Sequence, residues 1–189
     1  EVGLRMRGIA ARLKVAVTMA FTSLRLLHHR RNHVAGRSYL LVYGHPRSDA
    51  GGHDAYFGPL LKDMPELGRL LHTDCSTDRA DALGADGRSA ALHAWGNPLF
   101  ALTLFAVRWR PGRGALQGPN DWLIHRAAAL EGSGGAHAMT RWQMHCQRRW
   151  LAKVRPSAVV WPWENHPWER DFVRAARVQG ARTAGYLHT

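Results

Sequence analysis

The sequence contains few lysines, few cysteines and no long hydrophobic run near its N-terminus. Only three of its 26 basic residues are lysine, and its two cysteines, Cys75 and Cys146, stand far apart. Two isolated cysteines are typical of free thiols in a reducing compartment. The apolar run over residues 15–24 is much shorter than the roughly 20 residues of a membrane-spanning helix. We therefore expect a cytoplasmic protein, with peripheral attachment to the inner membrane as an alternative.

Two motifs that would indicate a bound cofactor or metal are also missing. No strand-like run is followed by Gly-x-Gly-x-x-Gly, and no Asp-x-Asp occurs, so a dinucleotide site and a metal-bridged sugar nucleotide have no support. His137, His145 and Cys146 share a predicted helix, but the two histidines are two turns apart. The sequence therefore predicts neither a resident cofactor nor a metal.

The positive charge is concentrated at the N-terminus. The net charge is +12, and residues 1–37 hold eight basic residues against one acid, Glu1. The tryptophan-rich tail is distant in sequence, whereas nucleic-acid-binding faces interleave basic and aromatic residues; we expect no nucleic-acid partner. The pattern predicts a basic amphipathic helix over about residues 4–31, which either lies on an anionic membrane or packs on the domain. We divide the chain into a helical arm, 1–36, and a domain, 37–189.

Strand-like and helix-like runs alternate along the rest of the chain. Apolar, β-branched or aromatic runs predict strands at 38–45, 67–74, 88–95, 157–161 and 182–188. Helices are predicted at 54–64, 98–109, 121–131, 136–154 and 167–179, the one at 98–109 buried on all sides. This order predicts α/β architecture: a Rossmann-like, mostly parallel sheet flanked by helices and preceded by the arm. The chain starts with Glu1 and stops directly after a predicted strand, so we expect a piece of a longer protein, truncated at the C-terminus.

The stretch "WPWENHPWERDF", residues 161–172, joins a predicted strand to a predicted helix. Pro167 suits the first helical turn, with Asn165 or His166 as the cap. Trp168, Phe172 and Ala176 recur every four residues, which predicts a stripe that packs on the sheet. Glu169 falls in the first turn, where its charge favours the helix dipole.

Polar residues follow several of the predicted strands: His45, Asp74, Glu164 and His188. In open α/β sheets, ligands bind in the crevice outside the carboxyl ends of the strands. If the last two strands are adjacent and parallel, Glu164 and His188 emerge side by side. A carboxylate beside an imidazole suits general-base chemistry or binding of a polyhydroxyl substrate. The alternative for Glu164 is a solvated loop carboxylate.

The tail "ENHPWERDFVRAARVQGARTAGYLHT" resembles a segment of bacterial surface-carbohydrate biosynthesis proteins of the two-Rossmann-domain (GT-B) glycosyltransferase type. A Glu-Asn-x-Pro-Trp-Glu run opens a helix there, and a Gly-Tyr-x-His run ends the next strand. The residues that carry the resemblance are Glu164, Asn165, Pro167, Trp168, Glu169, Gly185, Tyr186 and His188.

The resemblance implies the N-terminal, acceptor-side domain of a glycosyltransferase for surface polysaccharide. Such an enzyme transfers a sugar from a nucleotide-sugar donor, bound mainly by a second domain, to a glycan or lipid-linked acceptor. The candidate catalytic residues are Glu164 and His188, and the candidate substrate-binding residues are His45, Asp74, Asn165 and Glu169. Two alternatives remain open: a non-catalytic carbohydrate-binding module, and a basic protein that uses residues 1–34 on a membrane surface or on RNA.

Overall fold

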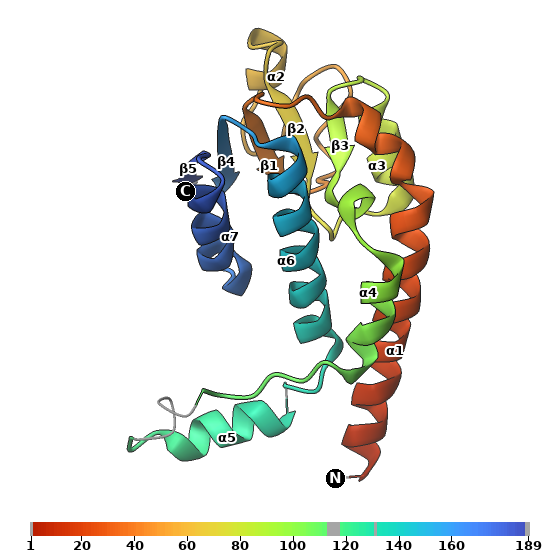
Figure 1. Ribbon diagram of the computed structural model, residues 1–189, viewed down its shortest axis with the longest axis vertical. Helices are drawn as coiled ribbons and strands as arrows, with labels where there is room; N and C mark the ends of the chain where they lie inside the picture. The colour runs from red at the N-terminus through yellow and green to blue at the C-terminus, as the bar shows by residue number, and fades with distance from the viewer. Residues whose placement is uncertain (1, 113–117, 131, 188–189) are drawn as a thin grey trace.

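The computed structural model describes residues 2–112, 118–130 and 132–187, and shows an α/β protein with one five-stranded parallel sheet (Figure 1). The strands lie in the order β3-β2-β1-β4-β5, and each neighbouring pair is parallel. Their bounds are β1 Tyr39–Val42, β2 Gly68–Leu71, β3 Ser89–Ala91, β4 Ala158–Pro162 and β5 Arg182–Tyr186. The predicted Rossmann-like class is confirmed.

Helices cover both faces of the sheet. Side chains alternate between the two faces along each strand, and the strands present apolar side chains on both faces, so both faces need cover. Tyr39 and Leu41 belong to one core cluster, and Leu40 and Val42 to the other. The first cluster lies under α1 (Val2–Arg25), α4 (Pro98–Thr103), α6 (Gly135–Val154) and α7 (Pro167–Val178). The second lies under α2 (Leu60–Asp63), α3 (Thr77–Gly84) and the 3-10 helix η1 (Leu27–Asn32). Further short 3-10 helices are η2 (Leu92–Trp95) and η3 (Leu104–Ala106).

The N-terminal segment takes part in the core. Figure 1 shows α1 running beside α4, and α1 also packs on α6 and η2. Ala16 and Met19 belong to the first cluster, and Leu26 is fully buried in the second. The side-chain amide of Asn32 donates hydrogen bonds to the carbonyls of Gly84 (3.0 Å) and Ser89 (2.8 Å). Of the two arrangements expected for the arm, the structure therefore shows packing on the domain.

Two of the helices predicted within the domain differ from the structure. In the helix predicted at 54–64, residues 54–59 form a turn and only α2 is helical. Gly58 has a φ of +58°, which no α-helix allows. Asp54 is buried, and its side chain accepts hydrogen bonds from Ser48 Oγ and from the Tyr56 N–H. The run over 98–109 is not buried all round: it divides into α4 and η3, and Leu99 is 73% exposed. The sequence also did not predict α3, which begins after Ser76, whose side chain caps the Arg79 N–H.

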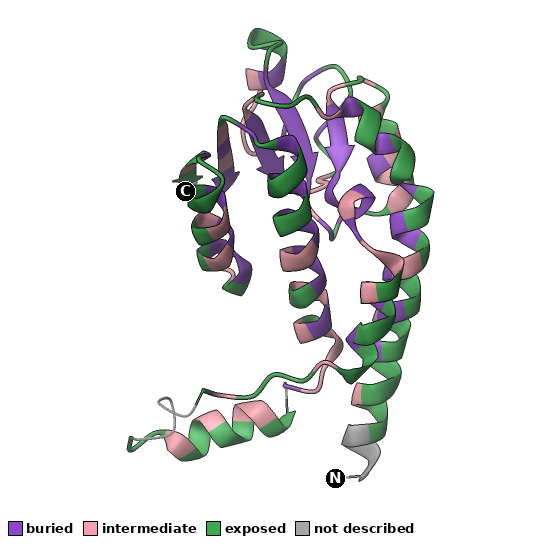
Figure 2. Ribbon diagram, in the orientation of Figure 1, coloured by how far each residue is buried: buried purple, intermediate pink, exposed green. Residues whose placement is uncertain are grey.

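One helix projects from the body. Helix α5 (Asp121–Leu130) extends sideways in Figure 1 and has no buried residue in Figure 2. None of the helices in the described ranges is both long and apolar enough to cross a bilayer.

Candidate functional site

A pocket of about 740 Å³ opens at the carboxyl ends of β1, β2 and β4. The chain leaves β1 toward β2 and β3, and later returns to the opposite side of β1 to form β4 and β5. This reversal is the topological switch point, where open α/β sheets bind their ligands. The pocket is lined chiefly by the exit loops of these three strands and by α6; its polar and aromatic lining residues include Tyr43, His45, Tyr56, His72, Asp74, Arg79, Gln143, Glu164, His166 and Trp168.

Glu164 lies in the pocket and is paired with a histidine. Its Oε2 is 2.9 Å from His166 Nε2, and both side chains are part-exposed. Asn165, between them, has a φ of +59°, a left-handed conformation that asparagine tolerates better than most residues. This turn places two side chains that are two positions apart on the same side of the loop.

The loop that carries Glu164 is fixed from below by Glu169. The Glu169 side chain is 0% exposed, and its Oε1 accepts a hydrogen bond of 3.1 Å from the backbone N–H of Glu164. His166 is the N-cap residue of α7, and Pro167 occupies the first turn, as predicted. A glutamate three residues after the cap often reaches back to such backbone groups. Glu169 therefore holds the loop and lies behind the pocket wall.

Tyr43, directly after β1, lies at the centre of an aromatic cluster. Its ring centroid is 4.9 Å from that of His72, 5.7 Å from that of Tyr56 and 6.2 Å from that of His166. Burial, and then the negative charge of Glu164, raise the pKa of the Tyr43 phenol. The phenol therefore stays protonated at neutral pH, with the Glu164 carboxylate as a hydrogen-bond partner.

The exit loop of β2 carries a second pair of histidine and carboxylate. His72 Nδ1 is 3.2 Å from Asp74 Oδ1, and the His72 ring lies 5.3 Å from that of Trp168. Both exit loops thus present a histidine and an acid two positions apart. The pocket therefore combines hydrogen-bond donors and acceptors with aromatic rings.

The structure gives a mixed outcome for the predicted site residues. His45, Asp74 and Glu164 come together at the pocket, as the carboxyl-end rule predicted. Asn165 and Glu169 do not line it: Asn165 shapes the loop, and Glu169 supports it. His188 lies outside the described residues, so its predicted position beside Glu164 stays a prediction.

Sequence reasoning missed Tyr43, His72 and His166 as lining residues. Each lies within two positions of a residue that was predicted: Tyr43 precedes His45, His72 precedes Asp74 and His166 follows Glu164. His166 was considered only as a helix cap. The alternation of polar residues in each exit loop is the pattern that could have identified them.

Side chains of α3, α6 and η2 hold the two other exit loops in place. Arg79 of α3 donates to the backbone carbonyls of His45 (2.6 Å) and Ser48, and so fixes the loop after β1. Gln143 of α6 accepts from the Thr73 N–H at 3.1 Å. The His93 ring bridges Trp142 Nε1 and the Thr73 carbonyl, each at 3.0 Å. These contacts position the pocket walls before any ligand binds.

The pocket cysteine is not suited to nucleophilic chemistry. Cys75 is 5% exposed, and burial, followed by the charge of Asp74, raises the pKa of its thiol to about 12. Among the described residues, the histidine, cysteine and acidic side chains close enough to share a metal ion are His28, His29 and Asp81, which lie away from the pocket. The pocket therefore depends on carboxylate, imidazole and phenol groups.

The comparisons with known proteins add no relative to this description. No protein-family model, no curated protein and no solved structure matches the chain.

Proposed function

We propose that the chain is the acceptor-side domain of a glycosyltransferase that builds surface polysaccharide, and that the switch-point pocket binds the sugar acceptor. One observation carries this proposal: the Glu164–His166 pair lies in an aromatic-lined pocket at the carboxyl ends of the strands. A sugar ring has apolar C–H faces and a rim of hydroxyls. The aromatic rings of Tyr43 and Tyr56 suit the C–H faces, and carboxylates and imidazoles suit the hydroxyls.

The proposed chemistry is displacement at the anomeric carbon of the donor. Glu164 accepts the proton of an acceptor hydroxyl, and His166 at 2.9 Å supports the carboxylate in this role. The acceptor oxygen forms the new glycosidic bond while the bond to the nucleoside diphosphate breaks, and the diphosphate leaves with the electron pair. The neutral Tyr43 phenol, a hydrogen-bond partner of the Glu164 carboxylate, helps to position that carboxylate. The nucleotide-sugar donor is assigned to a second domain, as the resemblance implies.

The rival function is a carbohydrate-binding module that uses the same pocket without chemistry. Glu164→Gln distinguishes the two, because the amide keeps the shape of the side chain but not its basicity. If the chain is the acceptor-side domain of an active transferase, the Glu164→Gln variant should still bind sugars, but its turnover should fall about 10²–10⁴-fold. Binding is measured by saturation-transfer NMR with a panel of hexoses and oligosaccharides, and turnover by release of nucleoside diphosphate in the longer protein.

Glu66→Gln is the matched control, since Glu66 is exposed and lies outside the pocket. It should leave binding and turnover unchanged. If Glu164→Gln keeps full turnover, the general-base role is wrong. If sugar binding occurs without any transfer in the longer protein, the binding module is the better description.

A second candidate function, attachment to an anionic membrane surface, is favoured by the outer face of α1. Large apolar side chains stand exposed at helical spacing along this face: Met6, Ile9, Leu13, Val17, Phe21 and Leu24. Figure 2 shows the contrast between this exposed side and the buried side that packs on the domain. Such a stripe, of which Phe21 is 70% exposed, is typical of helices that lie in the membrane interface.

The charges beside the stripe favour an anionic lipid. Arg7, Lys14 and Arg25 flank it on one side, and the sequence has no acid between residues 2 and 37. Each basic residue near an anionic bilayer contributes about 1 kcal/mol of attraction.

Cosedimentation with vesicles tests this attachment. The chain should bind phosphatidylglycerol-containing vesicles, bind pure phosphatidylcholine vesicles weakly, and lose binding at high salt. The double variant Leu13→Ser/Phe21→Ser should not bind, whereas Val178→Ser, at an apolar side chain 82% exposed on α7, should bind normally. Self-association of the chain in place of vesicle binding would show that the stripe joins two copies.

A further inference from the structure

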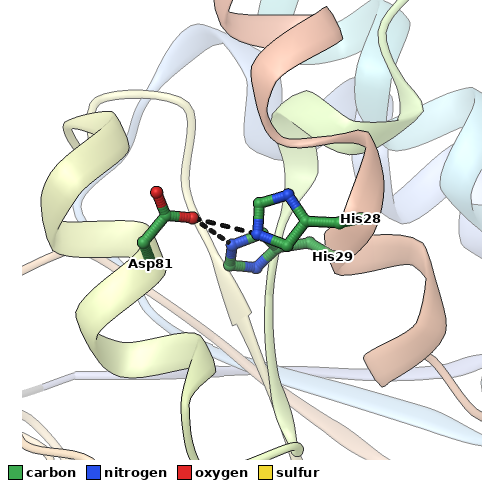
Figure 3. A group of neighbouring side chains, drawn as sticks. All are labelled: His28, His29 and Asp81. Atoms are coloured by element: carbon green, nitrogen blue, oxygen red, sulfur yellow. Dashed lines mark hydrogen bonds and ion pairs between the residues drawn. The ribbon is translucent and has the colours of Figure 1, made fainter.

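A group of metal-binding side chains lies where the N-terminal segment meets α3, away from the proposed sugar site. His28 and His29 come from η1 and Asp81 comes from α3, more than 50 positions later in the sequence. Figure 3 shows the three side chains pointing toward one another. Their nearest ligand atoms all lie within 4.8 Å of one another.

Both imidazoles face the same carboxylate oxygen. Asp81 Oδ1 is 3.1 Å from His28 Nε2 and 3.0 Å from His29 Nε2. The Arg25 guanidinium lies on the other side of the carboxylate, 3.8 Å from Oδ2, and pairs with Asp78. Arg25 therefore orients the Asp81 side chain so that Oδ1 points at the two rings.

One ring of the group also makes a contact that is common among metal-binding histidines. His28 Nδ1 is 3.0 Å from the Arg25 carbonyl. A metal-binding histidine commonly donates its other N–H to a backbone carbonyl in this way.

The second ring is held rigidly. His29 is 2% exposed, and a methyl group at Gly84 would lie 2.5 Å from its Cε1, so the ring sits directly against the backbone of α3. A site whose ligands are fixed before binding loses less entropy when the ion arrives.

We propose that His28, His29 and Asp81 form a zinc site that joins η1 to α3. Two imidazole nitrogens and one carboxylate oxygen are a donor set that zinc uses when a fourth position is left to water. The part-exposed His28 and Asp81 side chains, 46% and 37% accessible, leave that position open to solvent. The ion would tie the N-terminal segment to the helix that carries Arg79, and so stabilise the loop after β1.

Zinc binding to the chelator-stripped full chain tests the proposal by calorimetry and thermal melting. The wild type should bind one equivalent of zinc at micromolar concentration and melt at a higher temperature with zinc present, since binding to the folded state stabilises it. His28→Ala and Asp81→Asn should each weaken this binding about tenfold or more, in line with the usual effect of altering a metal's ligands or their supports, and should remove the rise in melting temperature.

Because His28 is part-exposed, its alanine variant should fold without metal, and circular dichroism checks this. His125→Ala is the matched control: His125 is an exposed histidine on α5, outside the group, and its loss should change nothing. Unchanged zinc binding in both ligand variants would overturn the proposal. So would an equal loss in His125→Ala, which would indicate zinc spread over surface histidines, or a wild type that binds no zinc.

Discussion

The role of the N-terminal segment can be tested with two leucines that lie two positions apart. Leu26 is 0% exposed and belongs to the cluster beneath the sheet, whereas Leu24 is 53% exposed on the outer face of α1. Leu26→Ala removes three buried carbons and leaves a cavity, which should lower the free energy of unfolding by about 2–5 kcal/mol. Leu24→Ala removes the same atoms from a solvent-exposed position and should change it by less than about 0.5 kcal/mol.

Urea unfolding of both variants, followed by circular dichroism, measures the difference. A loss of about 2–5 kcal/mol is a large part of the roughly 5–15 kcal/mol that holds a typical domain together. Removing residues 1–34 would also delete both hydrogen bonds from Asn32 to Gly84 and Ser89, so the truncated chain should lose its cooperative transition. Equal, small effects of the two leucine variants would show that the segment is an appendage that the domain does not need.

Two further predictions concern the core beside the pocket. Trp168→Ala should cost about 3–5 kcal/mol, because Trp168 is 4% exposed and packs with Trp161 and Phe172; a mild effect on urea unfolding with lost sugar binding would instead make Trp168 a ligand contact. Burial lowers the pKa of His93 to about 4, below the value of about 6.5 in an unfolded chain. Only the unfolded chain takes up this proton between these values, so stability should fall as the pH drops from about 6.5 to about 4. His93→Gln should reduce that slope in melts recorded across this pH range, and an unchanged slope would contradict the assignment.

Much of the architecture was predictable because it depends on local patterns. The short β-branched and apolar runs predicted all five strands, and Pro167 together with the Trp168, Phe172 and Ala176 stripe predicted α7 and the face it buries. The turn at residues 54–59 was wrongly predicted as a helix with Asp54 as its N-cap. In the structure, Asp54 instead accepts buried hydrogen bonds that only the folded loop makes possible. The carboxyl-end rule was enough to bring His45, Asp74 and Glu164 to one pocket, because parallel strands all end at the same edge.

The sequence by itself determined the class of the sheet, the amphipathic nature of α1 and the polar residues at the strand ends. Each of these depends on residues that are close together along the chain. Only the tertiary structure decided which face of α1 is buried, and that Leu26 lies in the core. It also decided that Tyr43 and His72 line the same pocket as Glu164, and that Asp81 meets His28 and His29. These contacts join segments that are far apart in the chain, so no local sequence pattern predicts them. They form only when packing on both faces of the sheet brings the segments together.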